Sequence, residues 1–388
     1  MKGKRLYILL SVLALLLVTG VVLLAGRPHA VAASTLPAPA AQQPDNSTCL
    51  GCHGGVDKTT DLPNGDKLNV AIDGEMFANS VHANISCQNC HVNISGYPHP
   101  ANSAQTAREY TMQYKDTCKT CHADQAKTQA DSVHAQKLAA GDTNAPVCAD
   151  CHNPHTQVKV QKKEDGTPAG SEHAKIALTC ATCHSKIYDE YLQSVHGSGI
   201  IDNKNPDVPA CTDCHGVHTI SDPNTARFRN SSIQMCARCH TDANIMDKYG
   251  LSTQVLNTYV ADFHGTTVTL FQKTNPDEMT NKPVCYDCHG VHNIARTDDP
   301  QKGLQMKENM LAACQKCHPD ATDSFPDSWL SHYIPSPEKY PLVYYVGLFY
   351  KILIPVVLGG MAVYVLSDVY FRFILKRRKA ASQAAKEE

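Results

Sequence analysis

Cysteine and histidine recur along this 388-residue chain in one fixed pattern, Cys-x-x-Cys-His. The pattern occurs nine times and uses all 18 cysteines together with nine of the 20 histidines. Thiol and imidazole groups bind soft and borderline metals, and thiols also form covalent bonds. The nine motifs, numbered here in chain order, are Cys49, Cys52 and His53; Cys87, Cys90 and His91; Cys118, Cys121 and His122; Cys148, Cys151 and His152; Cys180, Cys183 and His184; Cys211, Cys214 and His215; Cys236, Cys239 and His240; Cys285, Cys288 and His289; and Cys314, Cys317 and His318.

Three kinds of chemistry use paired cysteines. Disulfides would explain the even cysteine count but not the histidine after each second cysteine, and the chain is long for a disulfide-stapled scaffold. Structural zinc sites usually combine two cysteine pairs, or one pair with two spaced histidines. Covalent haem c explains the whole pattern, because two thiols form thioethers to the porphyrin and the adjacent imidazole ligates the iron. We therefore expect nine covalently bound haem c groups.

The eleven histidines outside the motifs show a second regularity. In two successive units, one histidine lies twelve residues after a motif histidine, and another lies three residues after the next motif histidine. The same elements recur elsewhere with altered spacing, which leaves only His29 and His173 outside the repeat. Methionine is an alternative distal ligand that would raise the haem potential, but the nine methionines follow no repeat. We expect the distal ligands to be His82, His99, His134, His155, His196, His218, His264, His292 and His332.

The stretch CTDCHGVH, residues 211–218, contains a motif histidine and a distal candidate only three residues apart. Three residues span at most about 11 Å of extended chain. To reach the opposite face of its own haem, His218 would have to pass around the edge of the macrocycle, and the segment is too short for that route. His218 should therefore ligate the iron of a neighbouring haem, as should His155 and His292 at the same spacing.

The number of distal candidates bears on function. A haem that reacts with a small molecule normally has a free or displaceable axial position. Nine distal histidines for nine haems would close every such position. Bis-histidine iron changes its oxidation state with little ligand movement, which suits electron transfer, and its potential should be low in the absence of a methionine ligand.

The elements between the motifs are predicted to be short. Many segments are rich in Asn, Asp, Gly, Pro and Thr, which favour loops. Residues 185–197 place Ile187, Tyr188, Tyr191, Leu192 and Val195 on one helical face, with a stop at Gly197. We expect a multihaem cytochrome c fold, in which short helices and loops wrap around a haem array with little or no sheet, together with one or two transmembrane helices.

Both ends of the chain suggest a membrane. Residues 6–26 form a long uncharged run after MKGKR, typical of a signal-anchor, although small residues at 29–34 leave a cleavable signal peptide as the alternative. A second apolar run ends before KRRK at 376–379. We expect an N-terminal signal-anchor or signal peptide over 1–26, a Pro/Ala-rich tether over 27–48, a nonahaem domain built of two-haem repeats over 49–335, a transmembrane helix over 340–375 and a cytoplasmic basic tail over 376–388. Both basic ends would then lie inside, and the haem domain would lie on the periplasmic face of the cytoplasmic membrane.

The haem-binding motifs, interleaved with Ser-Val-His-Gly/Ala and Cys-His-x-x-His elements, resemble those of membrane-anchored multihaem c-type cytochromes of anaerobic respiratory electron transfer. The resemblance covers residues 49 to about 332. It implies electron transfer between the quinone pool, or a membrane b-type cytochrome or quinol dehydrogenase subunit, and periplasmic or extracellular redox partners. The net charge of -2 gives no reason to expect nucleic acid.

Two rival functions remain at this stage. One is a multihaem oxidoreductase acting on nitrite, hydroxylamine or a sulfur oxyanion. Such enzymes often have lysine in place of one motif histidine, or lack one distal ligand, whereas every motif here ends in histidine. The other rival is direct quinol oxidation, which would need a quinone pocket near a membrane-proximal haem.

Overall fold

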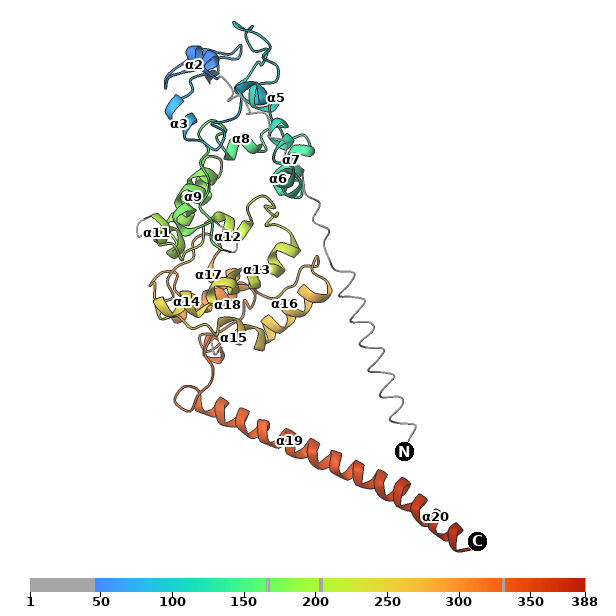
Figure 1. Ribbon diagram of the computed structural model, residues 1–388. Helices are drawn as coiled ribbons and strands as arrows, with labels where there is room; N and C mark the ends of the chain where they lie inside the picture. Colours follow the sequence, from blue (N-terminus) through green and yellow to red (C-terminus); the bar gives the residue numbers. More distant parts are fainter. Residues whose placement is uncertain (1–45, 165, 167, 202–204, 330–331, 388) are drawn as a thin grey trace.

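The computed structural model describes residues 46–164, 166, 168–201, 205–329 and 332–387. The predicted N-terminal signal-anchor and nearly all of the tether lie outside these residues. The described chain forms an elongated body in which sequence order follows position in space (Figure 1). The first motifs occupy one end, around α2 (Ser47–His53) and α3 (Gly74–Ala78), and the last motifs occupy the other end, from which the C-terminal helix extends.

The predicted predominance of short helices with little sheet is confirmed. In the described residues the only sheet pairs β1 (Thr59–Asp61) with β2 (Lys67–Asn69), antiparallel, with Thr60 opposite Leu68. The remaining elements are α4 (Cys87–Cys90), α5 (Ala107–Gln113), η1 (Thr117–Thr120), α6 (Ala123–Gln129), α7 (Val133–Ala139), α8 (Cys148–Cys151), η2 (Gly170–Glu172), α9 (His173–Ala181), α10 (Ser185–Leu192), α11 (Val195–Ile201), α12 (Cys211–His215), α13 (Ala226–His240), α14 (Ala243–Met246), η3 (Asp247–Tyr249), α15 (Val255–Ala261), α16 (Phe263–Thr274), α17 (Cys285–His289), α18 (Lys307–Gln315), η4 (Pro326–Ser328), α19 (Pro341–Val369), η5 (Tyr370–Leu375) and α20 (Lys376–Glu387).

The motifs occupy two kinds of local structure. Motifs 2, 4, 6 and 8 each form a helical turn of four or five residues, as in α8 and α12. Motifs 1, 5, 7 and 9 lie instead at the carboxyl end of a longer helix, as α13 shows by running through the whole of motif 7. Motif 3 departs from this alternation, because it begins in the 3-10 turn η1.

The single helix predicted over 185–197 is wrong. The structure divides the segment into α10 and α11, with the break at Gln193 and Ser194. The buried Ser194 hydroxyl donates to the Tyr191 carbonyl oxygen at 2.6 Å and accepts from the Gly197 amide at 3.0 Å, so it ends one helix and starts the next. Gly197 lies inside α11 and is no stop signal. A Cβ atom there would lie 2.0 Å from the Tyr191 carbonyl oxygen, which explains the glycine.

Few side chains are fully buried. The main apolar cluster joins Ile233, Tyr259, Val268 and Val284 of the last large unit. The other buried hydrophobic residues are scattered and mostly small, such as Ala104, Ala177 and Ala210. Such a small core is unusual for a body of this length, because burial of apolar surface is the main stabilising contribution to folding.

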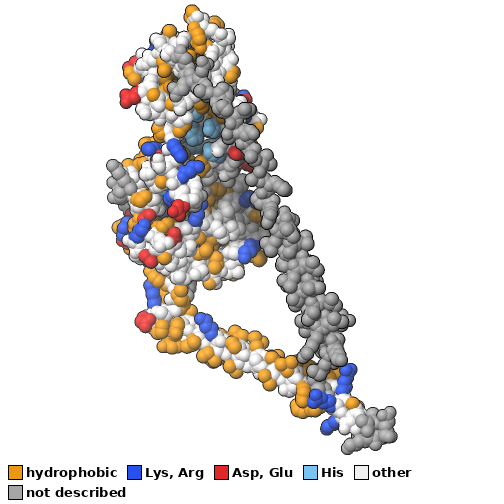
Figure 2. Space-filling view, in the orientation of Figure 1, with side chains coloured by type: hydrophobic (Ala, Val, Ile, Leu, Met, Phe, Trp, Pro, Cys, Tyr) orange, Lys and Arg blue, Asp and Glu red, His pale blue; other side chains and the backbone are white. Residues whose placement is uncertain are grey.

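Among the described residues, one helical segment is long and apolar enough to cross a membrane, over Pro341–Gln383. It comprises α19, η5 and most of α20. Its large apolar side chains are exposed along its length, including Leu342 and Tyr364. The segment leads away from the haem-motif region, and apolar side chains cover it (Figure 2).

Candidate metal centres

Each of the nine motif histidines lies opposite one histidine from outside the motifs. The two rings of each pair have centroids 5.9–6.4 Å apart. All nine distal candidates are used, and each is used once. The pairs are His53 and His99 (5.9 Å), His91 and His155 (6.1 Å), His122 and His82 (6.1 Å), His152 and His218 (6.1 Å), His184 and His134 (6.2 Å), His215 and His292 (6.1 Å), His240 and His196 (6.3 Å), His289 and His332 (6.2 Å), and His318 and His264 (6.4 Å).

This separation fits an iron atom between the rings. Imidazole nitrogens bind metals at about 2.0–2.1 Å, and adding roughly 1.1 Å from each ring centre to its nitrogen gives about 6.3 Å between centroids. In the part of the chain that the structure describes, no group of three or more His, Cys, Asp or Glu side chains is placed to hold a metal ion. Opposed imidazole pairs suit haem, because the porphyrin supplies the equatorial ligands.

The pairs follow a simple rule along the chain. The histidine that follows an even-numbered motif faces the motif histidine two motifs earlier, as His218 faces His152. The distal histidine that follows an odd-numbered motif faces the motif histidine two motifs later, as His134 faces His184. The exceptions lie at the ends, where His99 faces His53 and His332 faces His289. Consecutive repeats are therefore interlocked in both directions.

A repeated backbone hydrogen bond joins the two kinds of distal element. The valine amide N–H of each Ser-Val-His sequence donates a hydrogen bond to a backbone carbonyl oxygen. That oxygen belongs to the residue two positions after the second histidine of a Cys-His-x-x-His sequence. This bond brings together the distal histidines of consecutive motifs, such as His134 and His218, which face motifs 5 and 4. The three bonds are Val81 N–H to Gln157 O (2.8 Å), Val133 N–H to Ile220 O (2.8 Å) and Val195 N–H to Ile294 O (2.9 Å).

Several of the histidine rings are oriented through Nδ1. Nδ1 of His82 contacts the Pro154 carbonyl oxygen at 2.8 Å, and Nδ1 of His53 contacts the Val70 carbonyl oxygen at 2.9 Å. A carbonyl oxygen only accepts hydrogen bonds, so Nδ1 must be the protonated donor, and Nε2 keeps a free lone pair for a metal. Nδ1 of His264 lies 3.2 Å from the Asp262 carboxylate, the one arrangement of this kind with a charged partner among the described histidine pairs.

Burial favours the neutral form of several of the paired rings. Desolvation, followed by the nearby His240 ring, lowers the pKa of His196 to about 4. Burial and then the His332 ring lower the pKa of His289 to about 4. The pKa values of His91 and His155 are also lowered, chiefly by burial. Neutral imidazole is the form that binds a metal, so the surroundings favour the ligating state.

The cysteines show the order of the motifs in space. A cysteine of each motif interacts with a cysteine of the next motif along the whole chain. For example, burial and then the neighbouring Cys180 raise the pKa of Cys151 to about 11. The eight neighbouring pairs are Cys49 and Cys87, Cys90 and Cys121, Cys118 and Cys148, Cys151 and Cys180, Cys180 and Cys211, Cys214 and Cys236, Cys236 and Cys285, and Cys288 and Cys314.

An aspartate clamp holds motifs 4, 6 and 8. In motif 8, the Asp287 carboxylate accepts from the Val284 amide at 2.6 Å and from Arg229 at 2.8 Å, which links α17 to α13. Asp150 of motif 4 is held in the same way by Arg108 at 2.7 Å. The corresponding contact in motif 6 is His173, whose buried Nε2 lies 3.5 Å from the Asp213 carboxylate.

Sequence reasoning left His173 without a role, and the structure gives it a packing position between α9 and motif 6. A signal for this position was present, since His173 and Arg229 each lie seven residues before a motif cysteine. Sequence reasoning also missed the aromatic neighbours of the paired rings. These are Tyr114 at His91 (5.1 Å), Phe228 at His215 (5.4 Å), Phe325 at His318 (5.1 Å) and Trp329 at His264 (6.0 Å).

The comparisons with known proteins agree with this site. Residues 205–245, which contain motifs 6 and 7, match the family model of the doubled CXXCH motif. No curated protein matches the chain. The matched motif supports covalent haem c binding, and the chain therefore has the character of a multihaem c-type cytochrome that carries electrons.

Proposed function

We propose that this protein is a membrane-anchored electron-transfer cytochrome with nine bis-histidine haem c groups. The observation that carries the proposal is that all nine motif histidines face a second histidine at 5.9–6.4 Å. When bound, haem c supplies one-electron exchange between ferric and ferrous iron. The site residues of the proposal are the 18 motif cysteines as tethers, the nine motif histidines as proximal ligands and the nine opposed histidines as distal ligands.

In this proposal, the role of the polypeptide is to fix the distances between neighbouring haem groups. The cysteine pairs would tether the porphyrins at helix ends and short turns, and two opposed histidines would hold each iron. In every pair except His53 and His99, the two histidines come from separate repeats. The valine amide bonds then hold the distal histidines of consecutive motifs together. Because consecutive motifs are neighbours, the chain itself sets a single path from motif 1 to motif 9.

The C-terminal segment supports membrane attachment next to motif 9. Helix α19 begins at Pro341, nine residues after His332, which faces motif 8. The exposed apolar side chains of α19 suit a lipid environment. Lys376, Arg377 and Arg378 follow the span and mark a cytoplasmic end. We propose that the motif 9 end exchanges electrons with the quinone pool or with a b-type or quinol dehydrogenase subunit, and that the motif 1 end serves periplasmic or extracellular partners.

Function as a nitrite, hydroxylamine or sulfur oxyanion oxidoreductase is disfavoured by the same pairs, because a closed axial position leaves no place for a substrate. The histidine of motif 2 is opposed by His155. His99 lies opposite His53 of motif 1 instead.

Two measurements on the purified protein test the proposal. Intact mass spectrometry should show nine haem additions, and the purified protein should transfer electrons without reducing nitrite. After purification from membranes in mild detergent, a membrane redox subunit should co-purify with the protein. Otherwise, a quinol should reduce the haems of the isolated protein directly. A clearly smaller haem number, or rapid nitrite reduction by the isolated protein, would refute the proposal.

A further inference from the structure

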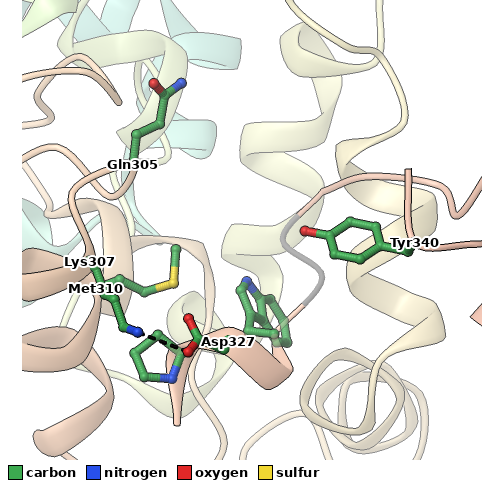
Figure 3. A pocket seen from close by; sticks show the side chains of 7 residues that line it. Gln305, Lys307, Met310, Asp327 and Tyr340 are labelled. Carbon is green, nitrogen blue, oxygen red and sulfur yellow. Dashed lines mark hydrogen bonds and ion pairs between the residues drawn. The ribbon is translucent and has the colours of Figure 1, made fainter. Parts of the chain in front are cut away.

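A cavity lies between the last haem motif and the start of the candidate membrane helix. It has a volume of about 350 Å³, which is within the usual range for small-molecule sites of about 300–1,000 Å³. Its walls come from three places: α18 and the loop before it, η4 with the following Trp329, and Tyr340 at the entrance to α19 (Figure 3). A molecule in this cavity would therefore touch both the motif 9 unit and the point where α19 begins.

The cavity is directly connected to a candidate ligand pair. Trp329 forms part of its wall, and the Trp329 ring lies 6.0 Å from the ring of His264. His264 in turn faces His318 of motif 9. One indole ring thus separates the cavity from a distal histidine, which is the relationship that electron exchange between a small molecule and the motif 9 centre would require.

The chemistry of the walls favours an uncharged aromatic ring that carries oxygens. Trp329, Tyr340 and Met310 supply aromatic and apolar surface. Lys307 and Asp327 are paired at 2.8 Å within the wall, so the pair adds no net charge. A phosphate group would need an unpaired cation, which argues against a lipid headgroup. The Asp327 carboxylate can accept a hydrogen bond from a hydroquinone hydroxyl, and the Lys307 ammonium can donate one to a carbonyl oxygen.

Tyr340 adds an independent observation. It has φ 62° and ψ 54°, the left-handed region, and is the one non-glycine residue with positive φ among the described residues. A bulky side chain occupies this region only where its surroundings require it, and such residues concentrate at functional sites. Here the unusual conformation places the ring at the cavity directly before the apolar helix.

We propose that this cavity binds the ring of a membrane quinone or hydroquinone, with Trp329 and Tyr340 against the ring. Asp327 would face a hydroxyl of the hydroquinone, and Lys307 a carbonyl oxygen of the quinone. The inference rests on the proposed electron-transfer function and names the small molecule served by its membrane end. It also explains why the cavity adjoins α19, since a lipid-soluble quinone reaches its site from the bilayer.

The test measures binding to the full-length holoprotein in detergent. The probe is 2-heptyl-4-hydroxyquinoline N-oxide, a fluorescent quinol analogue whose emission is quenched near haem. Wild type should bind one probe per chain. Met310→Trp, which fills the cavity, should weaken binding about tenfold or more, and Asp327→Asn should weaken it in the same direction. The controls are Met279→Trp, at an exposed methionine, and Asp298→Asn, which breaks an exposed ion pair with Arg296 outside the cavity.

Displacement of the probe by a short-chain quinone would support the proposal. Absence of binding, equal binding to wild type and to both cavity variants, or displacement by short-chain phosphatidylglycerol but not by quinone would overturn it. The haem number and the low-spin spectrum of each protein are recorded in parallel. A failed quinone site with nine intact low-spin haems is thus distinguishable from failure of the electron-transfer proposal.

Discussion

The amide of Val133 donates a hydrogen bond of 2.8 Å to the carbonyl oxygen of Ile220, although the two residues belong to different two-motif repeats. The bond sets His134 beside the loop that carries His218. His134 faces motif 5 and His218 faces motif 4, so this contact relates two consecutive metal centres. In the sequence CTDCHGVH, the first histidine therefore belongs to its own motif and the second to motif 4.

Replacement of His218 should alter one centre only. In His218→Ala the imidazole opposite His152 is lost, and one haem of nine should become high-spin and bind cyanide in the ferric state. His218→Met is the matched control, because a thioether can still ligate; it should stay low-spin and raise the potential of that haem. Electron paramagnetic resonance and a cyanide titration measure both effects. A His218→Ala protein that stays fully low-spin would refute the assignment.

Asp262 should lower the reduction potential of the motif 9 haem. Its carboxylate lies 3.2 Å from Nδ1 of His264, and such a partner makes the imidazole a stronger donor, which favours ferric iron. Asp262→Asn should raise the potential of one haem. Asparagine is also a good N-cap, so the start of α16 should be preserved.

Spectroelectrochemical titration tests this expectation against Asp298→Asn, in which the removed charge lies in an exposed ion pair. The control should titrate like wild type. If Asp262→Asn leaves every component of the titration unchanged, or lowers one, the proposed role of Asp262 is wrong.

Arg229 should contribute to stability through the motif 8 clamp. It is mostly buried and donates to Asp287 and to the Lys282 carbonyl oxygen, so Arg229→Ala removes these hydrogen bonds from two partly buried acceptors. We expect a loss of about 1–3 kcal/mol in the free energy of unfolding. Arg227→Ala, two residues away, breaks an exposed pair with Asp277 and should cost about 0–1 kcal/mol. Denaturant titrations of the two holoproteins provide the comparison, and equal losses would contradict the clamp.

Stability should fall as the medium is acidified. Without iron, the pKa of His196 and of His289 is lowered to about 4 in the folded chain, and iron ligation would lower it further, whereas histidine in an unfolded chain has a pKa of about 6.5. Between these values the unfolded state binds more protons, so this contribution is complete above about pH 6.5 and is lost as the pH falls toward 4. Thermal unfolding midpoints across this range should decline.

The variant His196→Met supplies the control for the pH series, because it keeps a possible ligand but removes one titrating ring. Its midpoint should depend less steeply on pH than that of wild type. Midpoints that are constant from about pH 7 to pH 4.5 would show that these rings do not govern acid stability.

The motifs and the choice of distal histidines followed from the sequence because both depend on local spacing. His218 could be excluded from its own haem by chain length alone. Its partner could not be named, because His152 is far away in sequence and is brought close by the docking of Val133 on Ile220. Pairing of this kind depends on long-range contacts that no single spacing records.

Other features of the structure could not be predicted from the sequence for similar reasons. The helix over 185–197 had the correct apolar face, but the Ser194 hydroxyl competes for backbone groups and divides it. The wide gap between His240 and His264 contains η3 and α15, which could not be predicted from the altered spacing, although His264 still reaches motif 9. His173 lay outside the repeat, and in the structure it takes the place that arginine has in the neighbouring clamps.

The most direct test of the central claim is spin quantification by electron paramagnetic resonance on the oxidised full-length protein in detergent. Nine bis-histidine centres predict that the integrated low-spin signal accounts for all nine haems per chain, with no high-spin component and no change on adding nitrite. A high-spin signal equivalent to one or more haems per chain would mean that an axial position is open, and it would contradict the proposal of a closed electron-transfer chain.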